Sequence, residues 1–363
     1  MKIGIITLSA SYNCGSMLQA YALKSILKKY GDVEIINFTS EKSERQYQII
    51  PSSIIDKFRF FKNDRKHFIK VFYEKKGYTE FQRYKLKLSN KKLYANQLYT
   101  IVEKFDVIVA GSDQIWNVDM NDFDEAFFCD WFKGKKVAYA PSLGQTDIST
   151  SSKAEKYKKY IDSFDFISAR EKFGSLCLKK LLKKDIPIVL DPTLLVTKEE
   201  WKRLIGKPLI ASEYIFYYSW AYLCNELNIL VKEKSAGKKM PVYVLDAHKW
   251  SNSHHKKYGF NLLSRGGPSV FLNLMYYAKE CYVESFHGLL FAYIFNKDFW
   301  ILNVSENLKE DDIRLYEMMS LLNVQNRLLW PNRKDISSDI SFNSSRLDFY
   351  AKKSFLYLDE AFK

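Results

Sequence analysis

Residues 266–300 hold the pattern that most restricts the fold, because two apolar helix patterns flank one short strand pattern. Two glycines and Pro268 form a turn, and proline is well tolerated at the first position of a helix. Four apolar residues then follow at helical spacing and form one buried stripe: Phe271, Leu274, Met275 and Ala278. Residues 281–283 are strand-like, and a second apolar helix is expected over residues 286–295. This succession is typical of an α/β fold.

His287 lies in the first turn of that second helix, since Ser285 is a good N-cap and directly follows the strand. Backbone N–H groups without helical partners and the positive end of the helix dipole favour an anion at such a point. An imidazole beside an anion can transfer a proton near neutral pH. A purely structural histidine is the alternative, and it stays open.

Short apolar runs recur along the chain in two series separated by helix patterns, as in a doubly wound parallel sheet. The predicted strands are residues 2–7, 33–38, 105–110, 136–140, 164–168 and 186–190, then 214–219, 242–245, 281–283 and 299–302. A chain of 363 residues also exceeds what one core usually supports. We therefore predict two Rossmann-like α/β domains, residues 1–190 and 191–340. An amphipathic helix within residues 341–363 is expected to return to the first domain.

Two loops of the first domain carry polar side chains directly after predicted strands. The first loop holds three candidates at a helix start: Asn13, Gly15 and Ser16. The second loop holds four residues suited to a sugar: Asp113, Gln114, Trp116 and Asn117. Ligands of open α/β sheets bind beyond the carboxyl ends of strands, so we expect these residues to share a cleft with His287. The alternatives are that Gly15 only forms a turn and that Trp116 only packs.

Arg170 follows the predicted strand at residues 164–168 and precedes a helix pattern. Its guanidinium group could hold a carboxylate or phosphate through two parallel hydrogen bonds. A simple pair with Glu171 or another acid is the alternative.

Residues 40–105 form a long, basic and aromatic insertion with a helical stretch over residues 54–73. Of the net charge of +14, an excess of nine positive charges lies between residues 41 and 105. A solvated lysine-rich surface is one interpretation. Attraction to anionic lipid or to an acidic glycan precursor is another. Nucleic acid is disfavoured, because no helix-turn-helix, zinc or RNA-recognition signature accompanies the charge.

The five cysteines form no Cys-x-x-Cys pair, and their odd number fits a reducing compartment. We find no secretory signal pattern and no apolar run near the roughly 20 residues needed to cross a bilayer. A cytoplasmic protein, peripheral to the inner membrane face at most, is expected. No metal is expected either, since the adjacent His254 and His255 point apart and are interpreted as a surface feature.

Four ordered motifs resemble those of the polysaccharide pyruvyl transferase family, in particular its Ser-Phe-His-Gly subgroup. They are Asn13-Cys14-Gly15, the segment Gly111-Ser112-Asp113-Gln114-Ile115-Trp116-Asn117, Ala169-Arg170-Glu171, and Gly-Pro-x-x-Phe-Leu followed by Ser-Phe-His-Gly-x-x-Phe-Ala within residues 267–292. These enzymes move pyruvate from phosphoenolpyruvate onto a sugar, usually as a cyclic ketal. The resemblance implies a glycosyltransferase-B-like pair of domains and no cofactor besides the donor substrate.

The resemblance further implies that His287 is the general acid and that Arg170 holds the donor. The other expected donor-binding residues are Ser285, Gly288, Arg265 and Gly267. The loops after the first-domain strands would then bind a sugar or lipid-linked glycan. Better-studied members have an arginine two residues before the histidine, where this chain has Ser285. Either another cation, with Arg265 nearest in sequence, replaces it or the donor differs. A nucleotide-sugar transferase and a non-catalytic glycan-binding protein of the same fold remain the alternatives.

Overall fold

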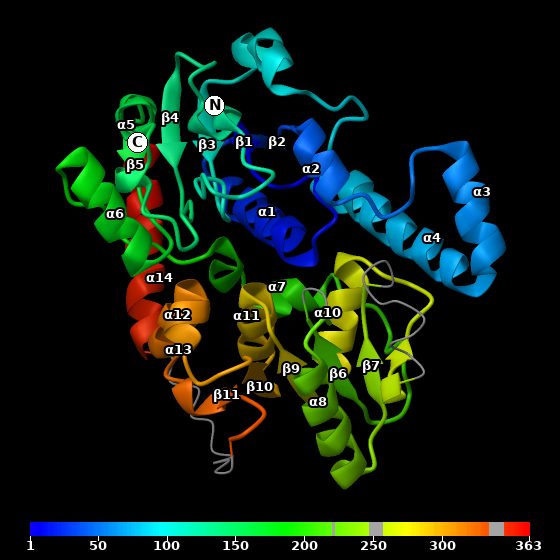
Figure 1. The fold of residues 1–363 in the computed structure, drawn as a ribbon. Helices are drawn as coiled ribbons and strands as arrows, with labels where there is room; N and C mark the ends of the chain where they lie inside the picture. Colours follow the sequence, from blue (N-terminus) through cyan, green and yellow to red (C-terminus); the bar gives the residue numbers. More distant parts are fainter. Residues whose placement is uncertain (220–221, 247–256, 334–344) are drawn as a thin grey trace.

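The computed structural model describes residues 1–219, 222–246, 257–333 and 345–363, and His254 and His255 lie outside these ranges. Two parallel sheets form the cores of two layered α/β units, one above the other in Figure 1. The first sheet has the order β2-β1-β3-β4-β5. Its strands are β1 (Lys2–Ile6), β2 (Asp32–Ile35), β3 (Val107–Ala110), β4 (Lys135–Ala138) and β5 (Phe166–Ile167). The helices around it include α1 (Cys14–Leu27), α5 (Ala154–Asp162) and α6 (Lys172–Leu182).

The second sheet has the order β11-β10-β9-β6-β7-β8, and every pairing in it is parallel. Its strands are β6 (Ile215–Tyr218), β7 (Val242–Val244), β8 (Asn261–Leu262), β9 (Glu280–Val283), β10 (Asp298–Leu302) and β11 (Leu328–Leu329). Its helices are α7 (Lys198–Lys202), α8 (Asn225–Lys238), α10 (Pro268–Tyr277), α11 (Phe286–Ile294), α12 (Leu308–Asp311) and α13 (Ile313–Leu322). The predicted fold class, two Rossmann-like α/β domains, is therefore confirmed.

Three details of the predicted strands were wrong. Residues 186–190 form only an isolated bridge between Ile188 and Ala169, since Pro187 has no amide hydrogen to extend a ladder. Strands β8 and β11 were missed, because pairs of residues are too short to show a period.

The basic insertion folds into α2 (Glu41–Gln46), α3 (Ile54–Asn63) and α4 (Arg65–Glu80), followed by two shorter helical segments, Phe81–Leu86 and Ala95–Lys104. The single helix expected over residues 54–73 is broken at Asp64, whose carboxylate accepts the His67 amide at 3.0 Å and caps α4. Figure 1 shows α3 and α4 as a hairpin that projects beside the second domain. The Tyr78 hydroxyl of α4 donates to Asp246, just past β7, at 2.9 Å.

The last helix, α14 (Ser345–Ala361), packs on the first domain as expected. The Tyr357 hydroxyl donates to the Ala138 carbonyl at 2.9 Å, and Ser354 Oγ accepts the Leu190 amide at 2.8 Å. Near its start, Arg346 donates to the Ser320 carbonyl of α13 at 3.2 Å. The helix therefore ties both domains together (Figure 1).

Each sheet has one position where the chain reverses its direction of travel, between β1 and β3 in the first and between β6 and β9 in the second. Loops that leave neighbouring strands toward opposite faces open a crevice at such a switch point. The two switch points meet in the candidate site described next.

Candidate active site

A pocket of about 340 Å³ lies between the two domains, at the carboxyl ends of the strands on both sides. The first domain contributes Leu8, Asn13, Gly15, Ser16, Gln46, Tyr47, Asp113, Gln114 and Met120. The second domain contributes Tyr218, Glu284, Ser285, Phe286, His287, Asp312 and Arg314. The structure thus brings His287 together with five of the seven predicted acceptor-binding residues, from loops that follow β1, β3 and β9.

His287 is held in the first turn of α11, whose N-cap Ser285 accepts the Gly288 amide at 3.0 Å. Its Nε2 lies 3.5 Å from Asp191 Oδ2, is shut off from solvent and has no hydrogen-bond partner among the described residues. Its Nδ1 lies against Gly15, where an added Cβ would come within 2.3 Å of that nitrogen. The imidazole is thus wedged between an acid and the start of α1, with Nδ1 beside a pocket-lining residue.

Asp191 is a fully buried carboxylate that serves three neighbours. Its Oδ1 accepts Thr193 N and Oγ1 at 3.0 and 2.7 Å, while Oδ2 faces Arg170 Nη1 at 3.2 Å and His287. Burial opposes its ionisation, but His287, Arg170 and Thr193 outweigh burial and hold the pKa of Asp191 well below its usual range. Asp191 is therefore a fixed negative charge behind the imidazole, suited to stabilise an imidazolium ion.

Arg170 does not face the pocket, so its assignment as the donor clamp is wrong. It is 3% exposed and lies 3.3 Å from Glu171, 3.2 Å from Asp191 and 3.6 Å from Asp113. Burial disfavours its charge, yet these three carboxylates raise the pKa of Arg170 above its ordinary value. Its guanidinium carbon also lies 4.2 Å from the ring centre of Phe286. Arg170 therefore positions the acids and the start of α11 across the domain boundary.

Each acidic side chain that lines the pocket is hydrogen-bonded, ion-paired or favoured in its neutral form. These acids therefore repel an anionic ligand less than free carboxylates would. Asp113 accepts the Ser16 hydroxyl at 2.7 Å and the Gln114 amide at 2.9 Å. Asp312 accepts two hydrogen bonds from Arg314, at 3.0 and 2.6 Å. Burial raises the pKa of Glu284, against hydrogen bonds from Ser219 and Tyr217, and so favours its neutral form.

Three helices begin at this pocket: α1 after Asn13, α11 after Ser285 and α13 after Asp312. Among the described residues that line the pocket, Arg314 is the one lysine or arginine. It was not predicted as a site residue from the sequence. It stands two residues after an N-cap aspartate, a local signal for a helix start, but nothing local connects residue 314 with His287. Asp312 caps α13 and pairs with Arg314, so the start of α11 and the remaining donor capacity of the Arg314 guanidinium are the groups here that suit a carboxylate or phosphate.

Several predicted site residues lie elsewhere. Trp116 is fully buried against Phe128 and Phe164, so its expected role in the cleft is wrong. Asn117 is outside the pocket lining and hydrogen-bonds Gln114 and Thr146. The indole of Trp116 has a large apolar surface, and its burial in the core directs this loop segment away from the cleft.

The expected donor-binding glycines and Arg265 are also corrected. The Gly288 amide is used by the Ser285 cap, and Gly288 does not line the pocket. Gly267, with a φ of 89°, allows α10 to start against the backbone of Gly77. Arg265 lines a different pocket, formed with α4. The turn at residues 265–267 therefore serves packing between the hairpin and the second domain.

The comparisons with known proteins agree with this geometry. A family model described as polysaccharide pyruvyl transferase matches residues 13–306. A search of curated proteins gave no match.

Solved structures of related fold have low sequence identity. Methanocaldococcus jannaschii UDP-GlcNAc 2-epimerase, in complex with UDP-GlcNAc and UDP, is 13% identical at a TM-score of 0.52, over 99% of this chain and 100% of that one. S. aureus MnaA with UDP is 12% identical at 0.50, over 99% and 89%. E. coli heptosyltransferase WaaC with ADP-2-deoxy-2-fluoro heptose is 10% identical at 0.40, over 83% and 88%.

At such identities the likeness shows the fold alone, which is the two-domain glycosyltransferase-B architecture. The family model spans most of the chain and includes Asn13, Asp191, His287 and the loop after β3. The chain therefore belongs to the polysaccharide pyruvyl transferase family.

Proposed function

We propose that the protein transfers a pyruvyl group from phosphoenolpyruvate to a sugar of a cell-surface glycan or its lipid-linked precursor, as a ketal. The observation that carries this proposal is the pairing of His287 with the buried Asp191 at a pocket where three helices begin. A general acid for carbon and a cradle for an anion are the two things that this donor needs.

In the proposed reaction, His287 donates a proton from Nδ1 to C3 of phosphoenolpyruvate, and C2 becomes electrophilic. Asp191 stabilises the imidazolium from the Nε2 side before the proton leaves. A sugar hydroxyl attacks C2 and its proton returns to His287. The bond between C2 and the phosphate oxygen then breaks, a second hydroxyl of the same sugar attacks C2 to close the ketal, and the proton of that hydroxyl leaves with the inorganic phosphate. The chain needs no metal for these steps.

The donor carboxylate or phosphate is proposed to bind the free amides at the start of α11 and the guanidinium of Arg314. Arg314 then replaces, as the cation that contacts the donor, the arginine that better-studied family members have at the position of Ser285. Asn13, Ser16, Asp113 and Gln114, on the first-domain side, are the proposed acceptor contacts.

A ligand screen by thermal unfolding tests the donor. Phosphoenolpyruvate at 100 times its dissociation constant should stabilise the protein by about 2.7 kcal/mol. Arg314→Gln should weaken this effect, whereas Arg203→Gln, at an exposed residue directly after α7, should not. Stabilisation by nucleotide sugars and none by phosphoenolpyruvate would favour a nucleotide-sugar transferase, and no response to either would favour a glycan-binding protein.

We further propose that the protein acts at the cytoplasmic face of an anionic membrane, through α3. This helix buries no residue and exposes Ile54 by 81%, Ile55 by 64% and Phe58 by 66% on one stripe flanked by lysines. Such a basic amphipathic helix lies in a bilayer interface. Among the described residues, no helix is long and apolar enough to cross a membrane.

Sedimentation with vesicles tests this contact. The parent should bind phosphatidylglycerol-containing vesicles more strongly than phosphatidylcholine vesicles. Ile54→Ser with Phe58→Ser should weaken binding on the order of 10-fold, because two apolar anchors are lost. The control is Leu176→Ser with Leu356→Ser, which removes two exposed leucines from α6 and α14. Equal binding by all three proteins would contradict the proposal.

A further inference from the structure

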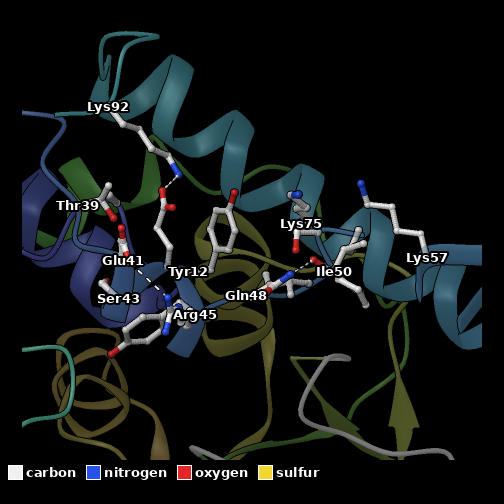
Figure 2. A pocket seen from close by; sticks show the side chains of 16 residues that line it. Tyr12, Thr39, Glu41, Ser43, Arg45, Gln48, Ile50, Lys57, Lys75 and Lys92 are labelled. Atoms are coloured by element: carbon white, nitrogen blue, oxygen red, sulfur yellow. Dashed lines mark hydrogen bonds and ion pairs between the residues drawn. The ribbon is translucent and has the colours of Figure 1, made fainter. Parts of the chain in front are cut away.

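A second pocket, of about 540 Å³, opens beside the candidate active site and is drawn in Figure 2. Its walls come from the loop after β1, from α2 and the segment that follows it, and from one lysine each on α3, α4 and the strand-like segment near residue 93. Neither the family resemblance nor the proposed chemistry gives this pocket a role.

The lining carries four cationic side chains: Arg45, Lys57, Lys75 and Lys92. Two of them are neutralised, since Lys92 lies 2.6 Å from Glu44 and Arg45 lies 3.3 Å from Glu41. Lys57 and Lys75 have no hydrogen-bond or ion-pair partner in the part of the chain that the structure describes. The pocket therefore has two positive charges without a counter-ion.

These charges lie close enough to repel one another. Figure 2 shows the ammonium ends of Lys57 and Lys75 on the same side of the pocket. Burial, and then the charges of Lys57 and Lys92, lower the pKa of Lys75. Two half-buried lysines, Lys57 and Lys75, that come from separate elements and face one another without an acid repel unless an anion joins them.

The second pocket adjoins the first through shared walls. Tyr47 lines both, Gln46 lines the first and Gln48 the second. Likewise Tyr12 lines the second pocket and Asn13 the first. One ligand could therefore place an anionic group among the lysines and a sugar beside Asn13 and His287.

We propose that this pocket binds a phosphate or diphosphate group attached to the acceptor sugar. The lysines supply point charges that match such an anion, and Lys57 stands on α3, the helix proposed to lie at the membrane. The acceptor role rests on the proposed function, but the anion site itself does not.

Calorimetric titration with inorganic pyrophosphate, in the presence of saturating phosphoenolpyruvate, tests the site. Lys57→Gln with Lys75→Gln should weaken pyrophosphate binding on the order of 10- to 100-fold, because two charge-assisted contacts are lost. The matched control, Lys62→Gln with Lys66→Gln, removes the same charge from α3 and α4 at residues outside the pocket. No binding by the parent, or an equal loss in the control, overturns the proposal.

Two further ligands identify the source of the anion. Farnesyl diphosphate in phosphatidylcholine vesicles that competes with pyrophosphate indicates a lipid-linked acceptor. Competition by glucose 1-phosphate alone indicates a soluble sugar phosphate. The two proposals can fail separately. If phosphoenolpyruvate does not stabilise the protein, but the parent binds pyrophosphate and the Lys57→Gln/Lys75→Gln variant does not, the proposed reaction is rejected and the anion site is supported.

Discussion

Glu284 is a buried carboxyl group that lines the candidate active-site pocket, so its protonation affects both the stability of the fold and the charge of the pocket. Burial raises the pKa of Glu284 in the folded protein, so the folded state binds the proton more tightly than the unfolded chain. Its contribution to stability is complete below the unfolded pKa and is lost as the pH rises through the folded pKa.

The contribution of Glu284 to stability should therefore grow as the pH falls from neutral toward the ordinary range of a glutamic acid, and Glu284→Gln should remove this pH-dependent gain. Unfolding midpoints of parent and variant across that range measure it. The exposed Glu199→Gln, on α7, is the control. Parallel curves for Glu284→Gln and the parent would show that this carboxyl titrates as in water.

Residue by residue, the sequence predicted what depends on neighbours in the chain. Asp113 and Gln114 were found because they follow an apolar strand, and His287 because Ser285 caps its helix. Arg170 was misassigned because two of its three acids, Asp113 and Asp191, come from distant segments. No single-sequence pattern shows that such acids will neutralise an arginine.

Among the elements, the contact between α1 and α11 sets the position of the imidazole. At Gly15 an added Cβ would lie 2.3 Å from His287 Nδ1 and 2.7 Å from its Cγ. Gly15→Ala must therefore turn the ring or part the helices, and a displacement near 1 Å can cost about 100-fold in rate. Initial rates of pyruvyl transfer measure this loss.

Gly237→Ala is the control for that variant, because a Cβ there meets nothing within 4 Å. In α8 it should leave the rate unchanged and stabilise the protein by about 0.5–1 kcal/mol. A Gly15→Ala enzyme as active as the parent would show that the close approach does not position His287.

Element boundaries were less predictable than element types. The helix pattern over residues 54–73 was real, but the Asp64 cap divides it into α3 and α4. A capping side chain competes with helix continuation, and in a basic amphipathic stretch both outcomes look alike in sequence.

At the scale of the whole molecule, α14 bridges the domains through a few polar contacts. The Tyr357 hydroxyl donates to Ala138, a carbonyl that Ser168 also serves at 2.8 Å. Tyr357→Phe leaves that carbonyl paired, so the free energy of unfolding should fall by about 0.5–1.5 kcal/mol. Urea midpoints measure the change.

Tyr350→Phe, two turns earlier on α14, should change the unfolding free energy little, because no hydrogen bond of its hydroxyl is found among the described residues. If both variants lose the same stability, the Tyr357 hydroxyl is not what holds α14 to the first sheet.

The two-domain architecture could be predicted because apolar strand runs and helix stripes alternate along the whole chain. The meeting of the two switch points could not, since it depends on how the domains pack. Asp191 and Arg314 became part of the site only through that packing.

His287 is the proposed general acid that protonates phosphoenolpyruvate for transfer to a sugar. The most direct test is transfer of labelled pyruvyl from phosphoenolpyruvate to glycan or glycolipid acceptors by the parent and His287→Gln. The parent should transfer the label, and the variant should transfer it at a rate lower on the order of 10²–10⁴-fold. Phosphoenolpyruvate binding and the unfolding midpoint of the variant should stay close to those of the parent. Equal rates in the two proteins would contradict this role.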